Sequence, residues 1–181
     1  GAGRAARRLL EDARELIAAR FGAAPADVVF TSGGTEADAL AIHALGRGRR
    51  LVVGATEHEA VRSAAAGAMI LPVDRSGVAD FDALRRLLEE GGPALVCLML
   101  ANNETGTLQP VAEAAAICRA HGALLHVDAI QAAGRVPVSL RDLGAHAMAI
   151  SSHKLGGPAG AGALLLAPEV SAIAPLIAGG G

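Results

Sequence analysis

Aromatic residues are almost absent from this sequence of 181 residues, which contains no Trp, no Tyr and only three Phe. Aromatic side chains usually supply much of the buried area of a domain, so Ala, Leu, Val and Ile must fill the core here. Ala-rich helices can pack closely on a sheet, which favours a layered α/β architecture. With 52% hydrophobic residues, the chain is long enough to form one sizeable core.

Long apolar runs and a strong excess of one charge are also absent. No apolar run approaches the ~18 residues of a membrane-spanning helix, and the formal net charge is -2. We interpret the arginine clusters at 4–8 and 47–50 as solvated faces. We therefore expect neither a nucleic-acid partner nor a membrane partner. No signal-peptide pattern is visible at the start, and we expect a cytoplasmic location.

Cysteine is scarce, since Cys97 and Cys118 are the only two, which is too few for a disulfide framework. Both lie in apolar segments, so we expect buried, inert thiols in a reducing cytosol. No group of His, Cys or acidic residues has a familiar ligand spacing, so no metal site is expected. The G-x-S-x-G nucleophile motif and the G-x-G-x-x-G dinucleotide motif are both missing.

Lysine occurs once, at Lys154, among 16 Lys and Arg residues. It follows the apolar run 147–150 and precedes a Gly-rich turn, whereas most lysines extend from a polar face into water. Arginine cannot lose its proton at workable pH or form a Schiff base, but lysine can do both. The single lysine therefore suggests covalent attachment of a carbonyl cofactor.

Helical and strand-like apolar patterns alternate along the chain. We expect helices at about residues 4–21, 35–45, 56–66, 80–90 and 110–122, and strands at 28–31, 51–54, 69–73, 94–100, 123–127, 145–150 and 160–166. The strands are continuous apolar runs, which is typical of a mostly parallel sheet with both faces covered. The predicted fold is a three-layer α/β/α domain.

Polar residues gather directly after the expected strands. Thr35, Asn103, Asp128 and Lys154 each follow the carboxyl end of a different strand. In open α/β sheets, ligands bind outside those ends. We therefore expect these side chains to form one shared site.

Several local patterns have a ligand-binding interpretation and a structural one. The segment 32–36, Ser-Gly-Gly-Thr-Glu, could hold a phosphate at a helix N-terminus, or simply cap that helix. Asp128 could pair with a pyridinium nitrogen or cap a loop, and Gln131 could face the same ligand or solvent. His58 could stack on an aromatic ligand or pair with a neighbouring glutamate. His126 lies within a strand and is expected to be a satisfied core histidine.

Five segments together resemble the large domain of cysteine desulfurases, which belong to the class V aminotransferase group of fold type I proteins and use pyridoxal 5'-phosphate (PLP). In chain order they are Phe30-Thr31-Ser32-Gly33-Gly34-Thr35-Glu36, Thr56-Glu57-His58, Asn102-Asn103-Glu104-Thr105-Gly106, His126-Val127-Asp128-Ala129-Ile130-Gln131 and Ser151-Ser152-His153-Lys154. Their order and approximate spacing match throughout, so the resemblance covers essentially the whole chain.

The resemblance implies a role for each site residue. Lys154 would form the Schiff base with PLP, and Asp128 would pair with the ring nitrogen. His58 would stack on the ring and assist proton transfer. The other expected contacts are Asn103 and Gln131 with the ring hydroxyl region, and Gly34, Thr35, Ser151 and His153 with the phosphate.

The resemblance further implies conversion of L-cysteine to L-alanine by a homodimer. The sulfur would pass to an enzyme persulfide, and then to an iron–sulfur scaffold or a thiolation partner. The persulfide cysteine and an arginine for the substrate carboxylate are expected beyond Gly181, since neither Cys97 nor Cys118 matches that region. Residues 1–181 would then be an incomplete PLP-binding large domain, without its N-terminal segment and C-terminal small domain.

Three alternatives remain open at this point. The parent protein could be a selenocysteine lyase, or another lyase or transferase of the same fold. The chain could be a truncated, non-enzymatic paralogue that dimerises without turnover. It could also be a Rossmann-type dinucleotide binder, although the missing glycine motif and the position of Lys154 count against that.

Overall fold

The computed structural model describes residues 1–170 and 172–179. Its strands are β1 (Val28–Thr31), β2 (Arg50–Gly54), β3 (Met69–Leu71), β4 (Ala94–Cys97), β5 (Leu124–Asp128), β6 (Ala147–Ser151) and β7 (Gly162–Leu166). They form one seven-stranded sheet in the order β1-β7-β6-β5-β4-β2-β3. The pairs β2–β3, β2–β4, β4–β5 and β5–β6 are parallel, whereas β7 runs antiparallel to both β1 and β6. The expectation of a mostly parallel sheet is therefore confirmed.

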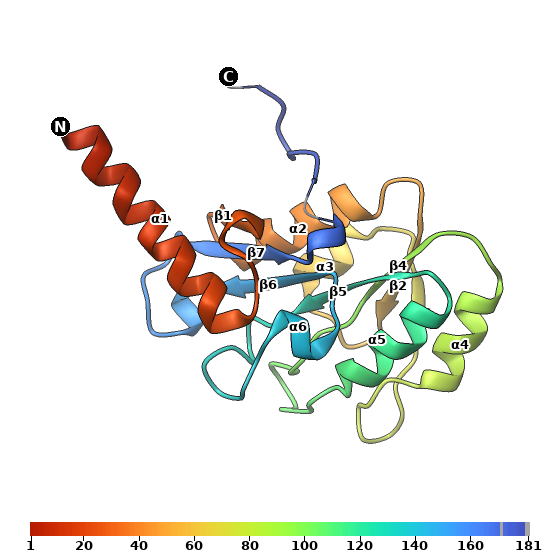
Figure 1. The fold of residues 1–181 in the computed structure, drawn as a ribbon. Helices are drawn as coiled ribbons and strands as arrows, with labels where there is room; N and C mark the ends of the chain where they lie inside the picture. Colours follow the sequence, from red (N-terminus) through yellow and green to blue (C-terminus); the bar gives the residue numbers. More distant parts are fainter. Residues whose placement is uncertain (171, 180–181) are drawn as a thin grey trace.

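Helices cover both faces of this sheet (Figure 1). They are α1 (Ala2–Phe21), α2 (Gly34–Leu45), α3 (Glu59–Ala64), α4 (Phe81–Glu89), α5 (Val111–Ala120) and α6 (Leu140–Leu143), with short 3-10 turns η1 (Pro25–Asp27), η2 (Ser152–Lys154) and η3 (Pro168–Val170). The local sequence explains where several of these helices begin or end. Gly22 ends α1 in the left-handed conformation at φ 72°, and the Asp80 side chain caps α4 by accepting from the Ala83 amide.

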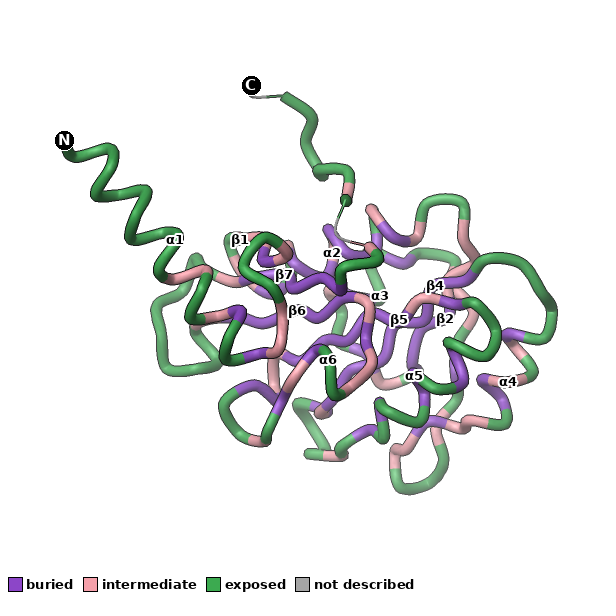
Figure 2. Tube along the Cα trace, in the orientation of Figure 1, coloured by how far each residue is buried: buried purple, intermediate pink, exposed green. Residues whose placement is uncertain are grey.

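The strands separate two apolar cores because successive side chains point to opposite faces. On β4, Val96 packs with the core under α4, α5, α6 and the end of α1, while Leu95 and Cys97 pack with the core under α2 and α3. On β5, Leu125 and Val127 belong to the first of these cores. Figure 2 shows the buried residues concentrated along the central strands. The three-layer α/β/α prediction is confirmed.

Some boundaries differ from the predictions. β4 ends at Cys97 rather than near residue 100, although the Leu98 and Leu100 amides still donate to the carbonyls of His126 and Asp128 at 3.0 and 2.9 Å. Beyond these residues, Ala101 and Leu108 form an isolated antiparallel bridge that closes the next loop. The third helix spans 59–64 instead of 56–66, and the four-residue α6 was not expected. Apolar periodicity detects neither turns nor single-turn helices.

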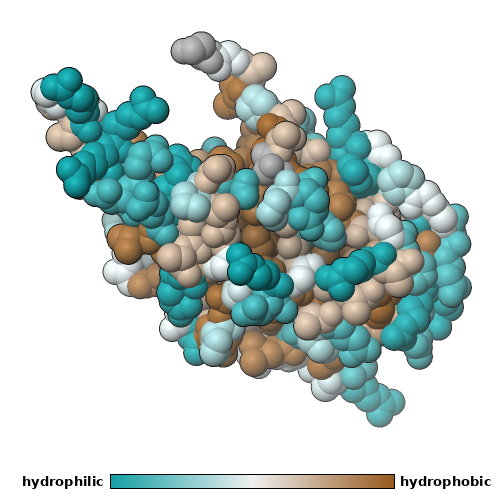
Figure 3. Space-filling view, in the orientation of Figure 1, coloured by the Kyte–Doolittle hydropathy of each residue, from teal (hydrophilic) through white to brown (hydrophobic). Residues whose placement is uncertain are grey.

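The first half of α1 projects from the body of the molecule (Figure 1). Its apolar residues repeat at helical spacing, yet Leu9, Leu10 and Leu16 are 71%, 56% and 72% exposed. Only Ala18 and Phe21 of this helix are buried. Hydrophilic residues dominate the surface of the projecting end (Figure 3). Among the described residues, no helix is both long and apolar enough to cross a membrane.

Candidate cofactor site

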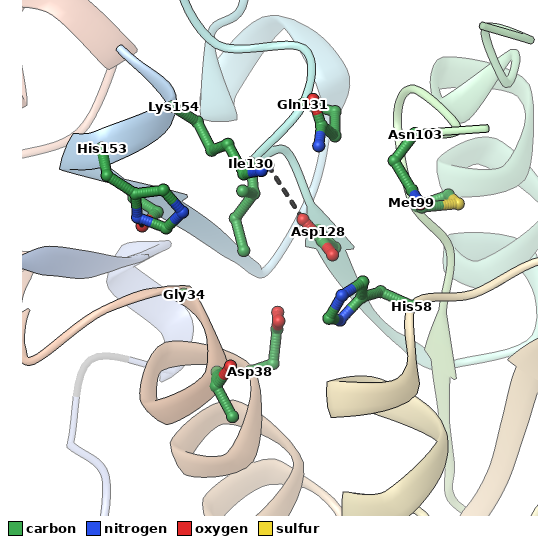
Figure 4. Close-up of a pocket in the computed structure, with 12 residues that line it drawn as sticks. Gly34, Asp38, His58, Met99, Asn103, Asp128, Ile130, Gln131, His153 and Lys154 are labelled. Atoms are coloured by element: carbon green, nitrogen blue, oxygen red, sulfur yellow. Dashed lines mark hydrogen bonds between the residues drawn. The ribbon is translucent and has the colours of Figure 1, made fainter. Parts of the chain in front are cut away.

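The carboxyl ends of β1, β2, β4, β5 and β6 open toward one cavity of about 230 Å³. Figure 4 draws the 12 residues that line it. They are Gly34, Thr35, Asp38, His58, Met99, Asn103, Asp128, Ile130, Gln131, Ser151, His153 and Lys154. Every residue proposed for the site from the sequence lies in this set. The sequence analysis missed Asp38, Met99 and Ile130.

Lys154 ends the 3-10 turn η2, directly after β6. The Leu155 and Gly157 amides both donate to the Ser152 carbonyl, at 2.9 and 3.0 Å, and these bonds fold the chain into a tight turn. The Lys154 side chain extends from this turn over the cavity (Figure 4). Lys154 is exposed, so its amine is accessible to a ligand that enters from solvent.

Asp128 is the last residue of β5 and is 5% exposed. Its Oδ1 accepts a hydrogen bond from the Ile130 amide at 2.8 Å. Burial and the Asp38 carboxylate raise the pKa of Asp128 from 3.8 to about 7, while the Ile130 amide and His126 act in the opposite direction. A cation placed beside this carboxylate would offset the cost of ionising it.

Asp38 and His126 form a fully buried pair, with 3.0 Å between Asp38 Oδ1 and His126 Nε2. His126 is therefore a core histidine, as expected, but the expectation of a satisfied side chain is wrong for Nδ1, which is buried without a hydrogen-bond partner among the described residues. Its partner Asp38 was not foreseen. A signal was present in the sequence, because Asp38 shares a helix face with Ala41, Ile42 and Leu45, at the i, i+3, i+4 and i+7 positions. A charged residue on an otherwise apolar helix face indicates a buried partner.

His58 is the N-cap of α3, and its Nδ1 accepts from the Ala60 amide at 3.1 Å. This bond fixes the ring, which points into the cavity (Figure 4). The alternative pairing with a neighbouring glutamate is wrong for both candidates. Glu59 accepts from the Ser63 hydroxyl at 2.8 Å, and Glu57 accepts from the Met99 amide. Burial raises the pKa of Glu57 well above its usual range.

The start of α2 forms the opposite wall. Gly34 is buried, and a Cβ there would collide with the Ile130 side chain. The Glu36 carboxylate accepts from the Ser32 amide at 2.6 Å, and its Ser32 hydrogen bonds lower its pKa. Beside Gly34, the Ser151 hydroxyl lies 2.9 Å from His153 Nδ1. Unpaired amides of the first helical turn, a hydroxyl and an imidazole together suit an anion.

Asn103 and Gln131 complete the lining from two loops. Asn103 lies in the loop after β4, which its neighbour Asn102 organises by accepting from the Glu104 and Thr105 amides, both at 2.9 Å. Gln131 follows Ile130 and is half-buried. Both side chains can donate or accept hydrogen bonds, so they can orient a polar ring substituent.

A family model described as "Aminotransferase class-V" matches residues 1–181. The chain belongs to the class V aminotransferase family. Members of this family and its cysteine desulfurases are PLP-dependent. The dinucleotide-binding alternative is therefore excluded.

Named relatives of this class V chain are cysteine desulfurases. An "IscS-like cysteine desulfurase" of Mycobacterium tuberculosis is 42% identical over 196 residues, which cover 99% of this chain and 50% of the relative. A "cysteine desulfurase" of Cereibacter sphaeroides is 44% identical, with coverage of 99% and 49%. The chain therefore spans about half the length of the curated relatives it matches.

Solved structures of NifS-like proteins and cysteine desulfurases also match this chain over about half of their length. A NifS-like protein from Rickettsia africae superposes with a TM-score of 0.92 at 34% identity, covering 99% of this chain and 52% of that one. The apo cysteine desulfurase of Thermococcus onnurineus gives 0.87 at 27% identity, covering 98% and 48%. The fold is thus that of the fold type I class V proteins.

The residues of this class V chain fit PLP chemically. The cavity offers an amine for an aldehyde, a buried carboxyl for a ring nitrogen and hydrogen-bond donors for a phosphate. The cysteines offer no competing nucleophile, because burial raises the pKa of Cys118 to about 12 and raises that of Cys97 well above its usual range, and neither lines this cavity. Within residues 1–170 and 172–179, no group of three or more His, Cys, Asp or Glu could hold a metal ion.

Proposed function

We propose that this chain is the PLP-binding part of a cysteine desulfurase, which converts L-cysteine to L-alanine and transfers the sulfur to an enzyme persulfide. One observation carries the proposal: the sole lysine and a buried aspartate face the same cavity in a class V chain. The names of the relatives support the choice of substrate.

Lys154, Asp128 and His58 would act on the reacting part of the cofactor. Bound PLP supplies an electron sink, and the protein sets orientation and charge. Lys154 Nζ would hold the cofactor at its aldehyde carbon and would move protons at the substrate. Asp128 would hold the ring nitrogen in its protonated form. His58, held by the Ala60 amide, would stack on the ring and assist proton transfer.

The remaining lining residues would orient the cofactor. The α2 amides at Gly34 and Thr35, with Ser151 and His153, would bind the phosphate. Asn103 and Gln131 would contact the ring hydroxyl region. The residues for the phosphate lie after β1 and at the end of β6, whereas Asp128, for the ring nitrogen, ends β5.

Neither cysteine of this chain is suited to accept the sulfur. Cys97 and Cys118 are both buried, and burial raises the pKa of both thiols. We infer that the acceptor cysteine belongs to a part of the parent protein other than residues 1–181. Homodimer formation and delivery to an iron–sulfur scaffold are part of the same proposal.

Covalent labelling tests the cofactor assignment. PLP added to the protein should give a visible absorption band, and borohydride should then fix the cofactor mass on the Lys154 peptide. Lys154→Arg should abolish both signals. The matched control is the double variant Lys154→Arg/Arg47→Lys, which moves the single lysine away from the cavity. Equal labelling of that double variant would overturn the assignment.

Turnover tests the second half of the proposal. With L-cysteine as substrate, the 181-residue chain loaded with PLP is expected to release little or no sulfide, since its thiols are buried. Alanine and sulfide production at a sustained rate would contradict the inference that another part of the protein supplies the acceptor.

A further inference from the structure

Three ionisable residues, two of which line the cavity, lie together, and we call them the buried triad: Asp38, His126 and Asp128. His126 and Asp128 are two residues apart on β5, so their side chains share one face of the sheet. Helix α2, which carries Asp38, packs against that face. Asp38 and His126 are 0% exposed and Asp128 is 5% exposed.

The triad is incompletely satisfied by the protein. Asp38 Oδ1 bonds to His126 Nε2 at 3.0 Å, but Asp38 Oδ2 and His126 Nδ1 are buried without a hydrogen-bond partner among the described residues. Asp38 also lines the cavity beside Asp128 (Figure 4). A buried polar atom without a hydrogen-bond partner lowers the stability of the fold. Two such atoms beside a ligand cavity therefore suggest that Asp38 and His126 serve the ligand.

The charge of the pair depends on a single proton. With an ionised Asp38 and a neutral His126 that donates from Nε2, the pair carries one negative charge. One additional proton makes the pair neutral but puts an N–H on the unpartnered Nδ1. Asp128 responds to this charge, because the Asp38 carboxylate raises its pKa and His126 lowers it.

Other ionisable groups surround the triad but act on it less directly. Burial favours the neutral form of Glu57, and also of Cys97, which pairs with His126 in the β4–β5 register. His58 before α3, and His153 and Lys154 on η2, are exposed, so water screens their interactions with the triad. The Asp38–His126 pair is the fully buried ionic partner of Asp128.

We propose that Asp38 and His126 are positioning residues that set the negative potential at Asp128 and thereby strengthen its hold on a cation in the cavity. Identifying that cation as the protonated ring nitrogen of PLP rests on the proposed function. The effect on Asp128 itself does not, since it is a property of the protein without ligand.

Carboxyl titration of the ligand-free protein tests this directly. With 13C-labelled aspartate, the Asp128 resonance is assigned by its loss in Asp128→Asn. Asp38→Asn, which keeps an oxygen for His126, should lower the Asp128 midpoint by about one pH unit. His126→Gln, which keeps a donor but cannot take up a proton, should raise the midpoint. Asp12→Asn removes the same charge from the exposed part of α1 and should leave the midpoint unchanged.

Opposite shifts in the two triad variants are the signature of an electrostatic role, which a purely structural role would not produce. Circular dichroism establishes that each variant is folded, and either variant can decide the sign if the other does not fold. Unchanged midpoints, or shifts in the same direction, would overturn the proposal.

PLP binding provides the second measurement. At a pH above the Asp128 midpoint, Asp38→Asn should raise the dissociation constant for PLP about tenfold. This factor is the free energy that corresponds to a shift of about one pKa unit. If wild-type protein binds no PLP, the proposed function fails while the carboxyl shifts still decide the role of the triad. If PLP binds equally well to wild type and Asp38→Asn, the positioning role fails while the proposed function stands.

Discussion

Replacing Gly162 by alanine is expected to disturb the start of α2 through one methyl group. Gly162 lies in β7, in register with Thr31 of β1 and Ser151 of β6. A Cβ at this position would lie 2.7, 2.8 and 2.9 Å from the C, Cα and O atoms of Gly33. Gly33 is the N-cap residue of α2, so the new methyl group would press against the backbone that precedes the helix.

The size of the effect follows from those distances. Carbon atoms in favourable contact are about 3.5–4.0 Å apart, so the methyl group would be about 1 Å too close. The strand cannot retreat easily, because β7 is hydrogen-bonded on both sides. Forcing an extra methyl group into a packed site costs about 1–3 kcal/mol. The expected loss in the free energy of unfolding is of this size, which lowers Tm by roughly 2–12 °C in a domain of this length.

Thermal and urea unfolding measure the loss, and PLP titration should show weaker binding because the amides of α2 move. Gly3→Ala is the control, since a Cβ at Gly3 meets nothing within 4 Å and the residue lies on the exposed part of α1. That variant should be neutral or slightly stabilised, because alanine is the better helix former. A Gly162→Ala protein as stable as wild type, with unchanged PLP affinity, would refute the steric reasoning.

Three further predictions concern buried ionisable groups. Because the folded pKa of Asp128 is raised from 3.8 to about 7, the fold keeps a proton that the unfolded chain has lost, so the free energy of unfolding should fall as pH rises through this window. Asp128→Asn should flatten that slope in urea melts by up to ~1.4 kcal/mol per pH unit; an unaltered slope would count against the shift. Glu57→Ala should cost about 1–3 kcal/mol, because it removes the acceptor of the Met99 amide, whereas Glu57→Gln should cost less, and progressively less as pH rises. Equal losses for both variants at all pH values would contradict this. Cys97 and Cys118 should react with a thiol reagent only after unfolding; rapid labelling of folded protein would show that a thiol is accessible.

Much of the fold could be predicted because its signals are local. Continuous apolar runs at β4, β5 and β6 indicated buried parallel strands. The polar residues after those strands then indicated one edge of the sheet as the site, and the structure brings Asn103, Asp128 and Lys154 to the same cavity.

What could not be predicted depends on contacts that are distant in sequence. The apolar run of β7 gives no sign that the strand reverses direction between β1 and β6. Asp38 becomes a site residue only because α2 packs on the sheet face that carries His126. The two residues are 88 positions apart in the sequence. The exposure of Leu9 depends on how far α1 extends beyond the sheet, and helical periodicity carries no information about that.

The alternation of side chains on β5 has a consequence for how the sheet assembles. Leu125 and Val127 face one core, while His126 and Asp128 face α2. A shift of one residue in the pairing of this strand would exchange the two sets. His126 and Asp128 would then enter an apolar layer without partners, at about 1–3 kcal/mol for each unpaired group. His126 and Asp128, which lie at the candidate site, thus also favour the correct pairing register of β5. Replacing them with apolar residues would lower the energetic cost of a shifted register.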